Sequence, residues 1–388
     1  MRRPFLRWPA RLPFGLIGMI ALVLPIEYGI QRSGELFMTP HERDWKAAGR
    51  LARSPVSRAE ILCFGDSMLK FGIAPPILQK QLGRSTYCLA LLDGKPPASY
   101  FLLRRALESG SRPRVVLVDY QPECMFQPRE SLAINRHWKA MLDPRETFDY
   151  AWNYRDFDFF GRIMLSRFLP SYCCRTEIRS NTLLAIAGQE SPNPLDNRKV
   201  GRNRRLNQGG LLLAPQPTFR GEVNPAFAES LYQADWFHRP ENTVYVRRFM
   251  ALAQEHGIPV VWVVPPNAPE VEQTREKIGL RARYDRFVEA VMQRYSNVYV
   301  LDARQSGYPA RVFVDPVHLD RNGATVLSLA IADALQAIVA DRQSTSPSGK
   351  RWIALAPFQS APTALVLEDM EQSRAHLIAL ERTKAVRR

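Results

Sequence analysis

Two short segments far apart in the chain contain the residue types of a nucleophilic catalytic centre. The first, Ile61–Ser67, is an apolar run that ends in Gly-Asp and the serine Ser67. The second begins about 250 residues later and places Asp315 three residues before His318. A serine hydroxyl becomes a good nucleophile when an imidazole takes its proton, and a carboxylate can orient that imidazole and stabilise its charge. The pattern predicts Ser67 as nucleophile, His318 as base and Asp315 as the residue that orients the base.

The elements between and around these residues alternate between strands and helices. Continuous apolar strands are expected at 60–64, 87–91, 114–120, 259–264 and 298–301. Segments with helical spacing or helix start and stop signals lie at 75–82, 99–109, 241–256, 281–295 and 322–339. Apolar strands that alternate with helices indicate a parallel sheet covered on both faces. The expected fold class is therefore α/β, a flavodoxin-like five-stranded parallel sheet with helices on both faces.

Four polar or glycine positions follow predicted strands closely, and their convergence can be expected from the fold class. They are Ser67, Gly94, Gln121 and Asn267. Ligands of open parallel sheets bind at the carboxyl ends of the strands. Asp66 precedes the serine and is expected to bond backbone amides of its loop.

The two terminal motifs resemble those of the SGNH (GDSL-like) hydrolase superfamily. Gly65-Asp66-Ser67 is similar to the nucleophile block, and Asp315-x-x-His318-Leu319 to the final block. The resemblance covers roughly residues 59–94, 112–122 and 256–340. It implies that Ser67 also supplies a backbone oxyanion donor, with His318 as base and Asp315 as its orienter.

The other two family positions fit less closely. Gly94 is similar to the glycine of the second block, which implies an oxyanion role. The Gly-x-Asn-Asp of the third block has no match, since the third strand runs out into Val118–Pro122. Gln121 and Asn267 are the remaining candidates for oxyanion or substrate contacts. In lacking the third-block asparagine, the chain resembles divergent, membrane-anchored members of the superfamily that serve envelope-polymer acylation, such as those of alginate O-acetylation and teichoic-acid D-alanylation.

The N-terminus has the composition of a membrane anchor. Residues 12–30 are mostly apolar and follow Arg2, Arg3, Arg7 and Arg11 without an acidic residue. A spanning helix needs about 20 apolar residues, and flanking arginines favour a cytoplasmic N-terminus. We expect a single-pass anchor with the remainder outside the cytoplasmic membrane. A cleaved signal peptide is the main alternative.

Length and composition favour one catalytic domain with a large insertion. We expect a basic end and anchor over residues 1–32, an α/β domain over 33–340 and a linker with a basic tail over 341–388. The tail is expected to be a peripheral appendage. A mostly helical insertion at about 124–240 contains many aromatic residues and the basic stretch 198–205. The aromatic residues could line a glycan or acyl-donor groove, or form a small helical core.

The chain has a formal net charge of +15 and five cysteines. The charge fits either a solvated basic surface or attraction to an anionic polymer or membrane. No nucleic-acid module accompanies it, so nucleic acid is not an expected partner. The histidines and cysteines lack metal-ligand spacing, and neither a metal nor a cofactor is expected.

These observations lead to two hypotheses on function. The first is a serine esterase or O-acyltransferase that acts outside the membrane on an acyl ester of an envelope glycan or lipid. The second is a non-catalytic, membrane-tethered binding or assembly protein on a degenerate hydrolase fold. The intact set of Ser67, Asp315 and His318 favours the first, and the missing asparagine favours the second.

Overall fold

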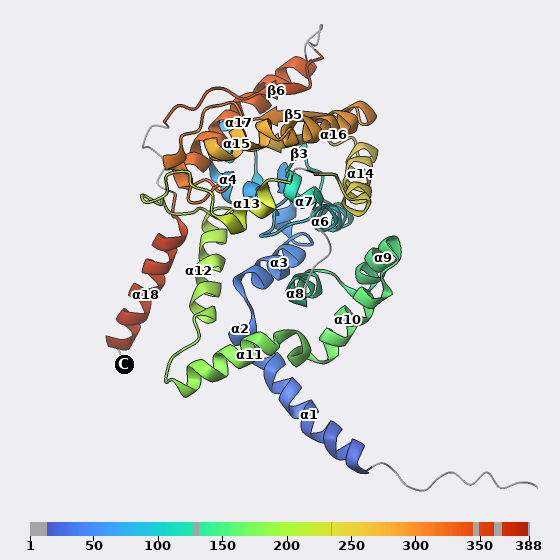
Figure 1. The fold of residues 1–388 in the computed structure, drawn as a ribbon, viewed down its shortest axis with the longest axis vertical. Coiled ribbons are helices and arrows are strands. Elements are labelled where there is room, and N and C mark those ends of the chain that lie inside the picture. Colours follow the sequence, from blue (N-terminus) through green and yellow to red (C-terminus); the bar gives the residue numbers. More distant parts are fainter. Residues whose placement is uncertain (1–13, 127–131, 234, 344–348, 361–366, 387–388) are drawn as a thin grey trace, which may run out of the picture.

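A parallel sheet organises the chain in the computed structural model, which describes residues 14–126, 132–233, 235–343, 349–360 and 367–386 (Figure 1). Its six strands lie in the order β2-β1-β3-β4-β5-β6, and all neighbours are parallel. The first five follow the flavodoxin-like order. The strands are β1 (Ile61–Phe64), β2 (Thr86–Cys88), β3 (Val115–Val118), β4 (Val260–Val264), β5 (Val298–Asp302) and β6 (Trp352–Ala354).

The prediction of five strands was wrong by one. The sixth strand, β6, lies within the segment expected to be a peripheral tail, and it pairs with β5 through Val300 and Trp352. β6 is only three residues long and contains no buried residue. Its strand character depends on the edge offered by β5, which local sequence patterns do not reveal.

The strands bury both faces of the sheet, as their continuous apolar composition indicates. Leu62 and Phe64 of β1 belong to one core, whereas Ile61 and Cys63 belong to the other. Helices α3, α6, α14 and α16 pack on the first face, and α4, α5, α15 and α17 on the second. Cys63 and Cys88 are register partners in the sheet, and all five cysteines are free thiols.

The helices agree closely with the segments predicted in the α/β part of the chain. The predicted helices at 75–82, 99–109, 241–256, 281–295 and 322–339 correspond to α5, α6, α14, α16 and α17. The bounds are α1 (Phe14–Arg32), α2 (Gly34–Phe37), α3 (Pro40–Leu51), α4 (Ser67–Gly72), α5 (Pro75–Leu82), α6 (Pro96–Glu108), α7 (Pro122–Phe126), α8 (Leu132–Met141), α9 (Pro144–Tyr154), α10 (Phe157–Phe168), α11 (Pro170–Ile186), α12 (Asn193–Leu206), α13 (Pro225–Leu231), α14 (Pro240–Glu255), α15 (Pro269–Lys277), α16 (Leu280–Arg294), α17 (Arg321–Gln343) and α18 (Met370–Val386).

The insertion is mostly helical, as expected, and contains α8 to α13. Part of its aromatic content forms a core rather than a groove. Trp138, Tyr150 and Phe159 are buried, and the Tyr150 ring lies 5.8 Å from Tyr245 of α14. The insertion is thereby attached to the face of the sheet that α14 covers.

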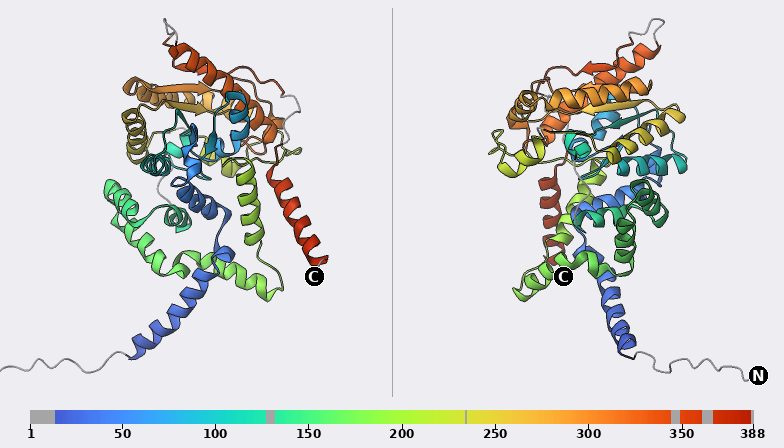
Figure 2. Two further views of the ribbon diagram at one scale, coloured as in Figure 1. Left: turned by 180° about the vertical axis from the view of Figure 1, so that it is seen from behind. Right: turned by 45° about the vertical axis from the view of Figure 1, so that its right-hand side comes forward.

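The C-terminal segment is an integrated part of the fold, which corrects the expected appendage. In Figures 1 and 2, α18 runs beside α12 of the insertion. Arg202 makes a bidentate contact with Glu368 at 2.7 and 2.9 Å, and Arg198 pairs with Glu381 at 2.6 Å. The linker residues 344–348 lie outside the described residues.

Helix α1 projects away from the rest of the chain (Figures 1 and 2). Many of its apolar side chains are exposed: Ile17, Met19, Ile20, Leu22, Val23, Leu24, Ile26 and Tyr28. The basic residues expected before it lie outside the described residues. By length and composition, one described helix passes the criterion for a membrane span, 321–339 in α17. That segment is 56% buried and packs against α4 and α5, as a core helix does.

Candidate active site

The nucleophile candidate Ser67 lies in a tight turn between β1 and α4. The turn passes through Gly65, whose φ of +138° is a conformation that residues with a side chain rarely adopt. A Cβ at Gly65 would lie 1.6 Å from Asp119 Oδ1, so a side chain is also excluded by contact. Asp66 then caps α4 by accepting a hydrogen bond from Met68 N at 2.7 Å, as expected from the sequence. Ser67 is the first residue of this helix.

Ser67, His318 and Asp315 form a continuous chain of hydrogen bonds. His318 Nε2 lies 2.8 Å from Ser67 Oγ, and His318 Nδ1 lies 2.7 Å from Asp315 Oδ2. With the Nδ1 proton donated to the carboxylate, Nε2 is the free acceptor for the serine proton. The arrangement has the geometry that a serine nucleophile, a base and its orienting carboxylate require.

Backbone contacts hold the base in place. Asp315 Oδ1 accepts hydrogen bonds from Val317 N at 2.9 Å and His318 N at 2.8 Å. The amide of Ala268, in the loop after β4, donates to Pro316 O at 2.9 Å. The ring of Phe71 packs edge-on against the His318 imidazole with centroids 5.1 Å apart. The imidazole is therefore restrained on both its carboxylate side and its ring face.

Asp315 is kept ionised by its neighbours. Burial alone would raise its pKa, but the hydrogen bond and charge of His318 and the two loop amides hold the pKa of Asp315 below its ordinary value. A carboxylate that stays ionised can stabilise the imidazolium that forms when His318 takes the serine proton.

A second buried carboxylate, Asp119, supports the serine turn and was missed by sequence reasoning. Its two oxygens accept hydrogen bonds from Asp66 N at 2.9 Å and from Leu69 N at 3.0 Å. Burial, together with the neighbouring Asp66 carboxylate, raises the pKa of Asp119 well above its ordinary value. Cys124 contributes as well, since its thiol donates to Asp66 Oδ2 at 2.6 Å. The position of Asp119 directly after an apolar strand was the available signal.

Gly94 lies against the nucleophile turn. A Cβ at this position would come within 2.1 Å of Gly65 O, so only glycine allows the two loops to approach so closely. The Gly94 amide, however, donates to Leu91 O at 3.1 Å. The structure therefore shows Gly94 as a close neighbour of the Ser67 turn whose N–H already has an acceptor.

Gln121 and Asn267 face a different cluster of polar side chains. Asn267 Nδ2 donates to Glu272 Oε1 at 2.6 Å. Gln121 and Glu272 line a cavity of about 10 Å³, together with Arg275 and Arg304; such a volume accommodates about one water molecule. Among the residues that the structure describes, neither amide forms a hydrogen bond with Ser67 or His318. The structure thus brings together Ser67, Asp315, His318 and Gly94, but places the Asn267 amide elsewhere.

The amide of Ser67 is the best-placed oxyanion donor. It is the first N–H of α4, where helical amides have no partner within the helix. None of the described residues accepts a hydrogen bond from it. An oxyanion beside Ser67 Oγ would lie at a helix N-terminus, which favours negative charge.

No protein-family model matches this chain, and comparison with curated protein sequences finds no significant match.

Proposed function

We propose that the protein is an SGNH-like serine esterase or O-acyltransferase, anchored in the cytoplasmic membrane by α1 with its catalytic domain outside. The observation that carries the proposal is the hydrogen-bonded chain from Ser67 Oγ through His318 to Asp315, at 2.8 and 2.7 Å. Its residues come from two segments far apart in the chain and meet at the carboxyl edge of a parallel sheet, where ligands of such sheets bind.

The geometry supports acyl transfer through a covalent intermediate. Ser67 Oγ attacks the carbonyl carbon of an ester while His318 Nε2 takes the serine proton. The oxyanion that forms is stabilised by the Ser67 amide at the start of α4. His318 then gives the proton to the leaving alcohol, which leaves an acyl group on Ser67. Water or a sugar hydroxyl, deprotonated by His318, releases that acyl group in the second half of the reaction.

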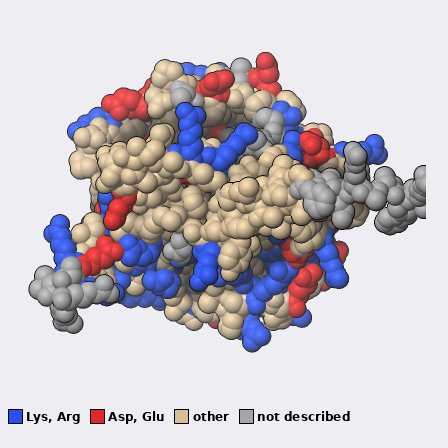
Figure 3. Space-filling model, turned by 90° about the horizontal axis from the view of Figure 1, so that it is seen from below, with Lys and Arg blue, Asp and Glu red and all other residues tan. Residues whose placement is uncertain are grey.

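Membrane anchoring is supported by the exposed apolar surface at one end of the molecule. Besides α1, the insertion helices α9 to α11 expose large apolar side chains: Phe148, Trp152, Phe157, Leu165, Phe168, Leu183 and Ile186. Figure 3 views this end, where uncharged residues form a broad surface flanked by Lys and Arg. The one acidic residue of α1, Glu27, is buried and accepts a hydrogen bond from Ser171 N at 2.9 Å. This contact removes a charge from the surface of the apolar helix.

A fluorophosphonate probe tests the catalytic proposal directly, since it reacts with activated serines. We expect labelling of the detergent-solubilised protein and its loss in Ser67→Ala. A small ester such as nitrophenyl acetate, with and without an added sugar acceptor, separates hydrolysis from transfer. Absence of labelling in well-folded wild-type protein would exclude the catalytic function.

A second candidate function, a membrane-tethered binding protein that has lost catalysis, is favoured by one observation. The amides of Gly94 and Asn267 already donate to Leu91 O and Glu272 Oε1. Of the described candidates, the Ser67 amide then remains as the free donor beside the Ser67 hydroxyl, since the unpartnered Gln121 Nε2 faces the cluster around Glu272. Losing one donor costs about a hundredfold or more in rate. The same labelling experiment distinguishes the two functions, because a binding protein has no need of an activated serine.

A further inference from the structure

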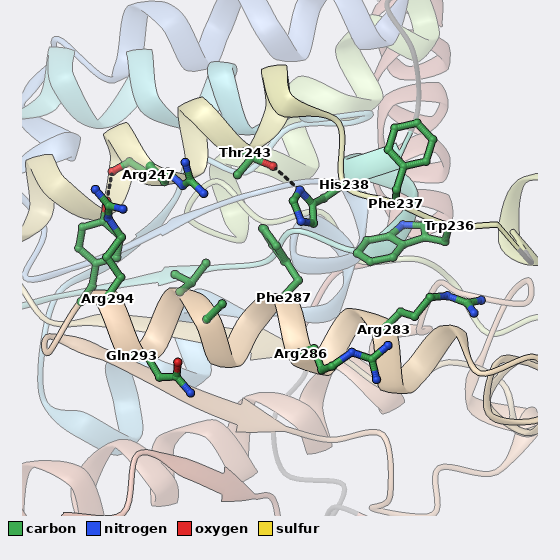
Figure 4. A pocket seen from close by; sticks show the side chains of 13 residues that line it. Trp236, Phe237, His238, Thr243, Arg247, Arg283, Arg286, Phe287, Gln293 and Arg294 are labelled. Carbon is green, nitrogen blue, oxygen red and sulfur yellow. Dashed lines mark hydrogen bonds between the residues drawn. The ribbon is translucent and has the colours of Figure 1, made fainter.

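A groove lined by arginines and aromatic rings lies outside the Ser67 site. It runs between α14 and α16 and is closed at one end by the segment 236–238 (Figure 4). Its volume is about 690 Å³, which is large enough for a ligand of several rings. None of Ser67, Asp315 and His318 lines it.

The groove is strongly basic. Arg247, Arg283, Arg286 and Arg294 line it, and no Asp or Glu is among the described lining residues. Arg247, Arg286 and Arg294 are exposed, and within the described part of the chain none of the three forms an ion pair. Their guanidinium groups are therefore available to an external anion.

The basic stretch 198–205 provides an instructive contrast. Its positive charge could recruit an anionic glycan or membrane surface, but most of its cations are already paired with carboxylates. Arg198 and Arg202 pair with Glu381 and Glu368 of the C-terminal segment, Lys199 lies 3.1 Å from Asp196, and Arg204 contacts Asp44. The stretch attaches α18 and α3 to α12. Its paired cations are therefore less available to an external anion than the arginines of the groove.

Aromatic side chains form the other part of the groove and are held rigidly. Trp236 Nε1 donates to Pro122 O at 2.8 Å, and the rings of His238 and Phe287 lie 4.7 Å apart. His238 Nδ1 lies 2.9 Å from Thr243 Oγ1. Phe237 is 50% exposed at the end of the groove, as its position in Figure 4 shows. An exposed ring on an ordered segment offers a flat apolar face at low entropic cost.

The spacing of the arginines indicates a ligand with repeated charges. Arg286 and Arg294 are eight residues apart on α16, which corresponds to about 12 Å along a helix axis. A single small anion cannot bridge that separation, whereas a chain of acidic units can. Guanidinium groups bind carboxylates through two parallel hydrogen bonds, and aromatic rings pack against the apolar faces of sugars.

We propose that the groove between α14 and α16 binds an acidic polysaccharide, a strand of sugars that bear carboxylates. This inference rests on the proposed location outside the membrane, which favours a glycan over nucleic acid as the polyanion. The groove would hold one stretch of the polysaccharide while another stretch of the same polysaccharide reaches Ser67.

Binding can be measured on the full-length, detergent-solubilised protein that carries Ser67→Ala, so that no turnover occurs. The probe is an oligogalacturonate of defined length, with a neutral malto-oligosaccharide of equal length for comparison. We expect the triple variant Arg247→Gln, Arg286→Gln, Arg294→Gln to bind the acidic probe about tenfold or more weakly at low salt, which corresponds to about 1.4 kcal/mol. Salt should weaken binding by the parent and affect the variant much less.

A matched control removes the same charge from another part of the surface. Arg50, Arg58 and Arg145 are exposed and do not line the groove, and their change to Gln should alter affinity by less than about twofold. Phe237→Ser should weaken binding while the salt dependence is retained, because stacking is not screened by salt.

Three results would overturn the proposal: equal losses in the two triple variants, tighter binding of single-stranded DNA through the same arginines, or binding of anionic lipid vesicles in place of the oligosaccharide. Fluorophosphonate labelling of the groove variants with Ser67 restored separates the two proposals. Labelling should be unchanged in these variants, so a groove that does not bind the acidic probe leaves the catalytic proposal intact. Wild-type protein that binds the acidic probe but is not labelled would exclude catalysis and leave the groove proposal intact.

Discussion

The side chains around Ser67 form two groups: those hydrogen-bonded in series to the serine hydroxyl, and those that hold the turn in which the serine lies. His318 and Asp315 are hydrogen-bonded in series to the serine, whereas Asp119 accepts two amides of the turn that presents it. The first group is expected to affect the rate of reaction, and the second to affect both stability and rate.

Asp315→Asn should lower the turnover of a small ester by about a thousandfold or more, because an amide cannot hold the imidazole in the required tautomer. Steady-state kinetics with nitrophenyl acetate measures this loss.

The lowered pKa of Asp315 leads to a second prediction, on the pH dependence of stability. A carboxyl whose folded pKa lies below its ordinary value of 3.8 loses its stabilising charge only as the pH falls through that lower value. The stabilising contribution of ionised Asp315 should therefore be fully retained above about pH 4 and lost only at lower pH. Urea unfolding of wild type and Asp315→Asn at several pH values measures this, and a stability difference between them that shrinks well above about pH 4 would contradict it.

Asp119→Ala should destabilise the fold by about 2 kcal/mol or more, since the amides of Asp66 and Leu69 lose their acceptors inside the protein. Asp119→Asn, which keeps one acceptor oxygen, should lose less. Because the folded pKa of Asp119 is raised, its ionisation costs stability as the pH rises from the unfolded value, near 4, towards the folded value. That part of the pH dependence should be absent in Asp119→Asn. Urea unfolding at several pH values tests this, and equal stability of Asp119→Ala and wild type would refute it.

At the scale of elements, a buried ion cluster joins the nucleophile helix to the insertion. Lys70 of α4 lies 2.9 Å from Asp44 of α3, and Arg204 of α12 lies 3.2 Å from the same carboxylate oxygen. The Lys70 and Asp44 side chains have no exposed surface. Lys70 also donates to Ala90 O at 2.9 Å, in the segment after β2.

Lys70→Ala should cost roughly 3–5 kcal/mol, because it leaves Asp44 buried with one of its two cationic partners removed. The double variant Lys70→Met, Asp44→Leu removes both charges and should recover part of the loss. Calorimetric melting of the two variants checks this. A double variant no more stable than Lys70→Ala would show that the cluster contributes through its shape rather than its charge.

The C-terminal strand and helix provide a second test at this scale. A chain that ends at residue 349 lacks β6, α18 and the buried side chain of Leu355. We expect it to lose at least about 2 kcal/mol, and the uncovered edge of β5 should promote aggregation. Removal of residues 387–388 alone serves as the control. An unchanged melting temperature and solubility of the shorter chain would restore the peripheral role that the sequence suggested.

For the whole molecule, α1 projects at one end, the sheet lies at the other, and the insertion helices rise from α11 beside α1 to α9 nearer the sheet (Figures 1 and 2). Helices α9 to α11 carry exposed apolar side chains. In the proposed orientation, the apolar end faces the bilayer and the carboxyl edge of the sheet is held outside it. Rings such as Trp152 and Phe168, which are 62% and 73% exposed, are suited to the membrane interface.

A topology reporter tests this orientation. Alkaline phosphatase fused after Arg388 should be active, and a fluorescent protein that matures only in the cytoplasm should be dark at the same position. Replacement of Arg2, Arg3, Arg7 and Arg11 by Gln should weaken the preference, because positive residues favour the cytoplasmic side. Reporter activity confined to the cytoplasm would overturn both the location and the class of substrate.

The sequence alone determined the features that depend on local pattern. Continuous apolar runs specify strands buried on both faces, and helical spacing with proline or glycine at the ends specifies α5, α14 and α16 within a residue or two. The same patterns place Ser67 and the Asp315–His318 motif near strand or helix ends, which is why the candidate triad could be predicted before the fold was known.

Only the tertiary structure decided which distant segments meet. The two amides bonded by Asp119, the glycine required at position 94, the edge that makes 352–354 a strand and the carboxylates that neutralise 198–205 all depend on contacts between residues remote in sequence. The groove between α14 and α16 has the same origin, since its arginines and rings come from separate segments. Local sequence specifies the conformation of each element, but the partners of its side chains are set by packing across the whole domain.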